Sequence, residues 1–250
     1  MGSSNVDTPG IRVHYHGGPV QVHPKFFVNY WGFNRRGSDP NGEQFYLTNF
    51  LAGIGGSRWL SDVTQYYEVV SGFRHFVHNG VGEMQGAWVD TTSIPSFPTD
   101  AQIQSAAKRL IAHFGFNKDA TYFVATSHNH NTSGFGTQFC AYHNFLTVGG
   151  RQAVYVNMPY MSDAGATCGE HAVNPGPSGV LDGVSIIGAV IVGDAQTDPF
   201  PPTGWITDDG RQVGSDCSGT NLRDITFSTG TFAIEGLWSN KRDVCSDSGP

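Results

Sequence analysis

Histidines provide the most obvious means by which this sequence could bind a metal ion. His128 and His130 are two residues apart after a strand-like segment, so their imidazoles could face the same side. With His143 or His171 brought close by the fold, they would supply the ligands of a metal-dependent hydrolase. The surrounding Asn, Ser, Thr and Gly residues are more typical of a solvated loop. We therefore expect no metal, and keep a relocated site at His128, His130 and His171 as the alternative.

Two carboxylates come next as candidates for chemistry. Asp194 and Asp198 are four residues apart and would lie on one side of a helix. The carboxylates of a glycoside hydrolase instead flank the scissile bond across several ångströms. Asp198 also precedes Pro199, which favours a helix end or a turn.

A thiol and a tryptophan complete the set. Cys168 and His171 have the residue types of a thiolate–imidazole pair, but a cysteine in a disulfide is no nucleophile. Trp205 could stack on a sugar ring if it is exposed. The candidate ligand-binding residues are His171, Asp194, Asp198 and Trp205.

The composition argues against several classes of protein. The chain has 250 residues, a formal net charge of -7 and only 14 Lys and Arg, which are scattered. We expect no nucleic-acid partner, because binding phosphates needs a basic surface. The longest apolar run, residues 184–192, is too short to cross a bilayer, so we expect a soluble protein without a membrane span. Residues 1–10 are interpreted as a leader and residues 11–250 as a single globular domain.

The cysteines indicate where the protein resides. There are four, an even number, and none forms the closely spaced pair typical of a zinc site or a redox dithiol. Two disulfides and a secreted, extracellular protein are therefore expected. Four cysteines allow three pairings.

Hydrophobic periodicity predicts a mixed α+β fold. Residues 100–114 form the clearest helix, with Thr99 or Asp100 as its cap and Gly115 at its end. A second helix is predicted over residues 44–54, and residues 60–70 could continue as a helix or a strand. Strands are predicted at residues 20–31, 121–126 and 152–158, with Pro24 marking an edge or a bulge. Residues 184–192 are uniformly apolar and β-branched, and periodicity alone favours a buried strand there.

A series of short blocks in a fixed order extends over residues 11–245. The blocks include His16-Gly17-Gly18-Pro19-Val20, Tyr30-Trp31-Gly32, Gln65-Tyr66-Tyr67, Phe139-Cys140-Ala141-Tyr142-His143, Tyr155-Val156-Asn157-Met158-Pro159-Tyr160, Thr197-Asp198-Pro199 and Gly204-Trp205. The ordered series resembles the Exordium (phosphate-induced) family and the secreted bacterial and fungal zinc-peptidase-like proteins related to it.

The resemblance implies a helix that has lost its metal ligands. In the peptidase-like members, a His-Glu-x-x-Glu helix precedes Thr-Asp-Pro and carries metal ligands and a general base. The corresponding residues here are Val190, Ile191 and Asp194, and Gln212 stands where a further acid is common. Neither Val190 nor Ile191 can bind zinc or transfer a proton.

The resemblance also implies the architecture. We expect a zincin-like α+β domain with a mixed sheet and a buried central helix over residues 184–194, capped by Asp182. The pairing it implies is Cys140–Cys168 and Cys217–Cys245.

These observations favour a non-catalytic protein. We expect a secreted pseudo-peptidase that binds or signals, without a cofactor, and whose partner is a carbohydrate of the cell wall or cell surface. The alternative is the metal-dependent hydrolase with the relocated histidine site.

Overall fold

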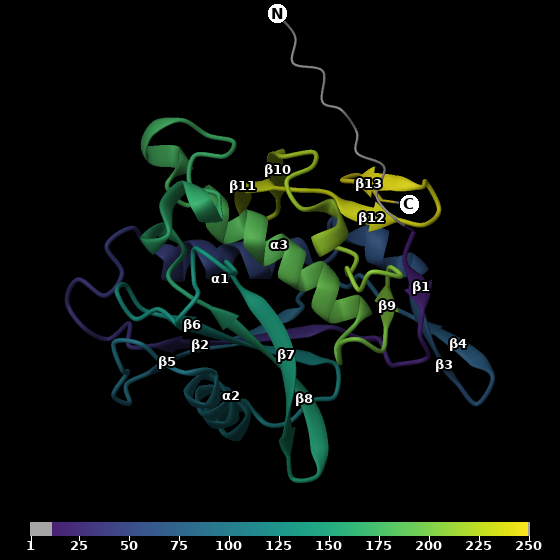
Figure 1. Ribbon diagram of the computed structural model, residues 1–250, viewed down its shortest axis with the longest axis horizontal. Helices are drawn as coiled ribbons and strands as arrows, with labels where there is room; N and C mark the ends of the chain where they lie inside the picture. Colours follow the sequence, from purple (N-terminus) through teal and green to yellow (C-terminus); the bar gives the residue numbers. More distant parts are fainter. Residues whose placement is uncertain (1–11, 250) are drawn as a thin grey trace, which may run out of the picture.

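A five-stranded mixed sheet forms the centre of the protein (Figure 1). The computed structural model describes residues 12–249, and the predicted leader at residues 1–10 lies outside them. The strands are β2 (Lys25–Trp31), β5 (Met84–Asp90), β6 (Ala120–Thr126), β7 (Tyr142–Val148) and β8 (Arg151–Met158). Their order is β5-β2-β6-β8-β7, with the first four parallel and β7 antiparallel at the edge. The expected α+β fold with a mixed sheet is confirmed.

Alternating side chains of the strands enter two separate cores. In β2, Phe26, Val28 and Tyr30 join the larger core on one face of the sheet. Phe27 and Trp31 pack into the smaller core on the other face. Both faces are therefore buried, which explains why the interior strands β2, β6 and β8 are mostly apolar. Pro24 directly precedes β2, which is an interior strand and not an edge strand. The register of β2 with β5 shifts between Phe26 and Phe27, so of the two predicted alternatives, edge or bulge, the structure agrees with the bulge.

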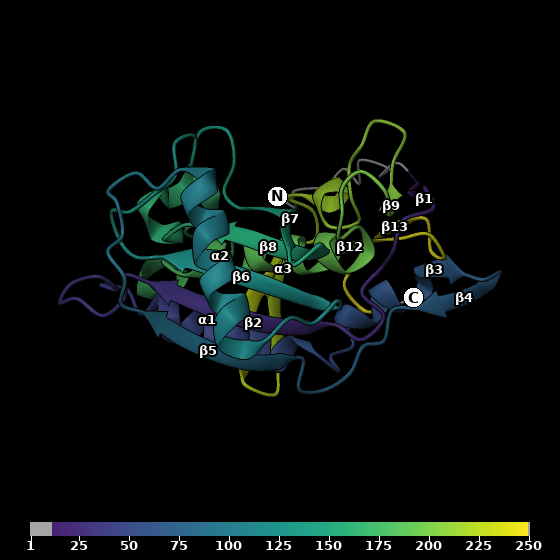
Figure 2. The same ribbon diagram turned by 90° about the horizontal axis from the view of Figure 1, so that it is seen from below.

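Within the described residues, three α-helices cover the sheet. They are α1 (Glu43–Ile54), α2 (Asp100–Phe114) and α3 (Asp182–Thr197). Helix α2 lies alone on the face of the smaller core, whereas α1 and α3 pack together on the opposite face (Figure 2). Helix α2 begins with a capping box, in which Thr99 and Gln102 bond to each other's backbone N–H, and ends at Gly115 with φ of 95°. The residues of α2 match the prediction.

The remaining strands form small antiparallel pairs around this centre. They are β1 (His14–Tyr15) with β9 (Trp205–Ile206), β3 (Tyr67–Val70) with β4 (Phe73–Phe76), β10 (Arg223–Phe227) with β11 (Gly230–Ile234), and β12 (Leu237–Ser239) with β13 (Val244–Ser246). The β3–β4 hairpin projects from the body of the molecule (Figures 1 and 2). The ambiguous segment at residues 60–70 divides into a 3₁₀ helix, Leu60–Gln65, and β3.

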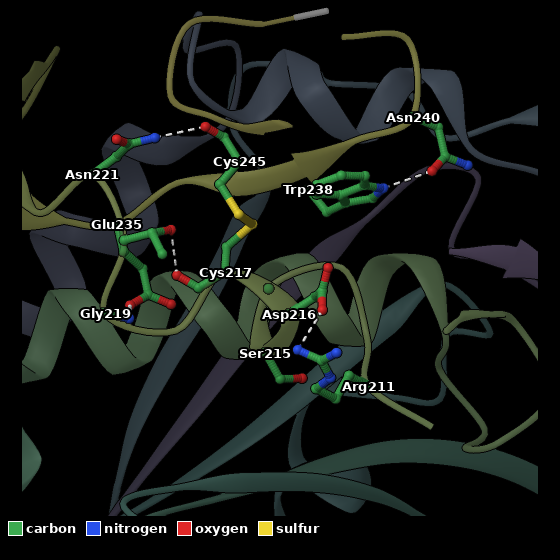
Figure 3. The surroundings of a disulfide bond; sticks show 12 residues. Arg211, Ser215, Asp216, Cys217, Gly219, Asn221, Glu235, Trp238, Asn240 and Cys245 are labelled. Atoms are coloured by element: carbon green, nitrogen blue, oxygen red, sulfur yellow. Dashed lines mark hydrogen bonds and ion pairs between the residues drawn. A yellow bond between two sulfur atoms is a disulfide. The ribbon is translucent and has the colours of Figure 1, made fainter. Parts of the chain in front are cut away.

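Two disulfides join the outer segments, and they have the pairing that the resemblance implies. Cys140 is bonded to Cys168, and Cys217 to Cys245. The second bond is buried beside β12, where Asn221 donates a hydrogen bond to the carbonyl oxygen of Cys245 at 2.6 Å (Figure 3). Such bonds are compatible with an extracellular protein.

Helix α3 belongs to the most apolar segment of the chain. Among residues 12–249, one helical segment, Gly176–Thr197, is long and apolar enough to cross a membrane. In that segment, 72% of the most apolar window is buried inside the molecule, which is typical of a core helix.

Candidate functional site

The helix α3 carries the residues that the resemblance aligns with a metal site. Residues 184–194 are helical and mostly buried, as the resemblance implies, although periodicity alone favoured a strand. Asp182 is the first helical residue and does not cap the helix, so the expected cap is wrong. Its carboxylate instead accepts hydrogen bonds from the backbone N–H groups of Val173 and Asn174 at 2.8 and 2.7 Å. Asp182 therefore holds the preceding loop against the start of the helix.

A hollow of about 360 Å³ lies between α3 and the segment that leads into β7. Val190, Ile191 and Asp194 all line it, together with His143 of β7 and Gln212 of the loop after β9. Val190 is half-buried and Ile191 is 4% exposed. The floor of the hollow is therefore apolar at the two positions that the resemblance aligns with a metal ligand and a general base.

The carboxylate of Asp194 accepts hydrogen bonds from other groups of the protein. One carboxylate oxygen accepts hydrogen bonds from the backbone N–H groups of Gly214 and Ser215 at 2.6 and 3.1 Å. The other accepts a bond from the hydroxyl of Ser215 at 2.7 Å. Burial raises the pKa of Asp194 to about 7, against the opposing effect of these bonds. The carboxylate fixes the 212–218 loop on α3.

Hydrogen bonds between polar side chains connect two residues that line the hollow, His143 and Gln212, to the buried Asp198. The side-chain amide nitrogen of Gln212 donates to the carboxylate of Asp198 at 2.8 Å, which leaves the amide oxygen to accept from Nε2 of His143 at 3.2 Å. Asp198 also accepts bonds from the backbone N–H groups of Thr203 and Gly204 at 3.1 and 2.7 Å. Burial lowers the pKa of His143 and keeps the imidazole neutral. Asp198 thus fixes the turn after α3, as its position before Pro199 predicted.

The three histidines of the alternative metal site have separate partners. His128 pairs through Nδ1 with Asp163, and His130 contacts the carbonyl oxygen of Pro95 at 2.8 Å. His171 lies beside Glu170, with 3.5 Å between Nε2 and the carboxylate. Within residues 12–249, no three His, Cys, Asp or Glu side chains are grouped so that they could hold a metal ion. Within the described residues, His128, His130 and His171 therefore do not form the metal site of the alternative hydrolase hypothesis.

Trp205 is not the exposed platform that its position near Pro199 suggested. Its side chain is 8% exposed because Tyr15, Tyr66 and Tyr67 surround it, and its indole N–H donates to the carbonyl oxygen of Tyr67 at 2.8 Å. The residue nevertheless lines a pocket of about 440 Å³, which is separate from the hollow over α3.

The four candidate ligand-binding residues do not form one site. Asp194 lines the α3 hollow, and Asp198 is buried next to Gln212. Trp205 lines a separate pocket, and His171 lies in the loop before α3. Two of the three tyrosines around Trp205, the half-buried Tyr15 and Tyr67, were not singled out from the sequence. Their only sequence signal was that Tyr67 belongs to one of the family-like blocks.

Comparisons of the chain with known protein families, with curated proteins and with solved structures find no match.

Proposed function

We propose that this chain is a secreted, non-catalytic binding or signalling protein of Exordium-like descent, built on a zincin-like scaffold that has lost its metal site. The observation that carries the proposal is the pair Val190 and Ile191 on α3. Both side chains face the hollow, where a peptidase of this descent would place a metal ligand and a general base. Their hydrocarbon side chains leave that surface without either group.

The polar side chains that line the hollow or lie next to it support the same proposal. Asp194 and Asp198 accept three hydrogen bonds each from protein donors and are held in place by them. Gln212 is an amide, which can hold Asp198 and His143 in register but cannot act as a general base at neutral pH. The ligand class that we propose is carbohydrate, by analogy with the Exordium-like proteins.

Restoring the missing ligands tests the scaffold. The variant Val190→His/Ile191→Glu/Asp194→Glu should bind zinc at one ion per chain, measured by calorimetry and metal analysis. Asp194 also fixes a loop, so Val190→His/Ile191→Glu serves as a second variant that retains its hydrogen bonds. The control Val190→Gln/Ile191→Gln places polar groups at the same positions without ligands and should bind no zinc.

The unmodified chain should lack zinc-dependent activity. Chelation should leave its thermal unfolding temperature unchanged, because no metal contributes to its folding free energy. Casein cleavage that disappears on chelation would overturn the pseudo-peptidase proposal. Folded His/Glu variants that bind no zinc would show that α3 is not the ancestral metal helix.

A further inference from the structure

The pocket next to Trp205 differs from the hollow over α3 in its aromatic walls and basic rim. Its side chains come from β1, from the entry to β3, from β9 and from the loop between β12 and β13. It has a volume of about 440 Å³. Four segments far apart in sequence therefore converge on one surface site.

Aromatic rings give the pocket a fixed wall. The Tyr15 ring lies 5.4 Å from that of Tyr67 and 5.5 Å from that of Trp205, centroid to centroid. The hydroxyl of Tyr15 accepts a hydrogen bond from the backbone N–H of Val69 at 3.0 Å, and Trp205 is tied to the Tyr67 carbonyl. Both tyrosines are half-buried, so part of each ring remains accessible. Such a surface can pack against the apolar face of a sugar ring at a small entropic cost.

Basic side chains form the rim of the same pocket. Arg12, His14 and Lys241 line the pocket, and all three are exposed. None of the described residues that line the pocket is acidic. Arg12 forms an ion pair with Asp243 at 4.0 Å, and because both side chains are exposed, this pairing contributes little in water. The whole chain has a net charge of -7. This pocket is therefore a local concentration of positive charge on an acidic protein.

Asn240 contributes an uncharged polar side chain to the lining of the pocket. Its side chain accepts a hydrogen bond from Trp238 at 2.7 Å and donates to the carbonyl oxygen of Val13 at 2.8 Å, which fixes its position between the rim and the floor. The combination of rings, fixed polar groups and cations matches a ligand that has both an apolar face and negative charge.

We propose that this pocket binds an acidic saccharide, with Tyr15 and Tyr67 against the sugar ring and Arg12 and Lys241 at its carboxylate or sulfate group. The proposal rests on the carbohydrate-binding function proposed above and names its site and ligand class. Ion pairing with a ligand anion would displace the weak contact between Arg12 and Asp243.

Calorimetric titration with an oligogalacturonide tests the proposal, because its methyl ester is a matched neutral ligand. The free acid should bind, and the ester should bind at least about tenfold more weakly, since charge-assisted hydrogen bonds are lost. A carrageenan oligosaccharide, which carries sulfate and no carboxylate, identifies which anion is preferred.

Matched variants locate the site. Arg12→Gln/Lys241→Gln should weaken binding of the acid at least about tenfold. Arg35→Gln/Lys108→Gln removes the same charge from exposed positions in the loop after β2 and on α2, and should leave the affinity within about twofold. Both pairs are exposed, so the folded state should persist, and circular dichroism checks this.

The outcomes distinguish this proposal from the function on which it rests. Equal affinity for acid and ester, or equal loss in both double variants, overturns the site. Binding of a neutral glycan alone also overturns it, while carbohydrate binding stands. If a glycan array detects no binding at all, both the ligand class and this site fail, and the zinc-binding variants of α3 still test the scaffold.

Discussion

Asp194 holds the 212–218 loop on α3 with both of its carboxylate oxygens. It accepts hydrogen bonds from the backbone N–H groups of Gly214 and Ser215 and from the Ser215 hydroxyl. The resemblance aligns Asp194 with an expected ligand position, where it is the one carboxylate. Its structural role could not be predicted, because its partners belong to a loop about 20 residues downstream whose path depends on the whole fold.

Two substitutions at Asp194 should separate its hydrogen-bonding role from its charge. Asp194→Ala leaves two backbone N–H groups buried without acceptors, and should lower the free energy of unfolding by about 3 kcal/mol. Asp194→Asn keeps an acceptor for those groups and removes the buried charge, and should change stability by less than about 1 kcal/mol. Urea denaturation at pH 7 measures both. An alanine variant as stable as the asparagine variant would contradict this role.

At the scale of elements, α3 forms from residues that favour strands. Its Val and Ile residues are β-branched, and periodicity could not distinguish a buried helix from a buried strand. The ordered blocks of the resemblance predicted the helix because they carry information about the whole chain. Helix α2, which is amphipathic with a capping box, was predictable from local pattern alone. The burial of Trp205 was not, because it depends on tyrosines from two distant strands.

Glycines allow α3 to approach its neighbours closely. A Cβ at Gly183 would overlap the carbonyl oxygen of Cys168, which is backbone and is held by a disulfide. A Cβ at Gly193 would lie 2.5 Å from Cδ2 of Leu237, the end of a side chain that can rotate. Both glycines lie within α3, but an added side chain would meet backbone at Gly183 and only another side chain at Gly193.

Alanine substitutions at these glycines should have different effects. Gly183→Ala should lower the free energy of unfolding by about 3 kcal/mol through overpacking. Gly193→Ala should cost less than about 1 kcal/mol, because the gain in helix propensity of about 1 kcal/mol offsets part of the strain. Chemical denaturation of both variants beside the unmodified chain measures the difference. Equal effects would indicate that backbone proximity at Gly183 does not limit the packing of α3.

At the scale of the whole molecule, several carboxyl groups are buried on the side of the sheet that carries α1 and α3. Burial raises the pKa of Glu43 and Asp194 to about 7 and of Glu83 and Glu235 to about 8. The folded chain therefore binds more protons than the unfolded chain between about pH 4.5 and 8, and loses stability as pH rises through this range. His143 acts in the opposite direction, since its lowered pKa costs stability below about pH 6.5. Because four carboxyl groups oppose one imidazole, we expect the net stability to fall as pH rises.

Thermal stability should accordingly be higher in mildly acidic solution than in alkaline solution. We expect the unfolding temperature at pH 5.5 to exceed that at pH 8.5 by at least about 5 °C, measured by differential scanning calorimetry. Glu235→Gln should reduce this difference, because it keeps an acceptor for the backbone N–H of Gly219 and removes a charge that is buried at pH 8.5. Asp208→Asn, at an exposed carboxylate, is the matched control and should leave the difference unchanged. An unfolding temperature that rises from pH 5.5 to pH 8.5 would show that these buried carboxyl groups ionise in the folded protein without loss of stability.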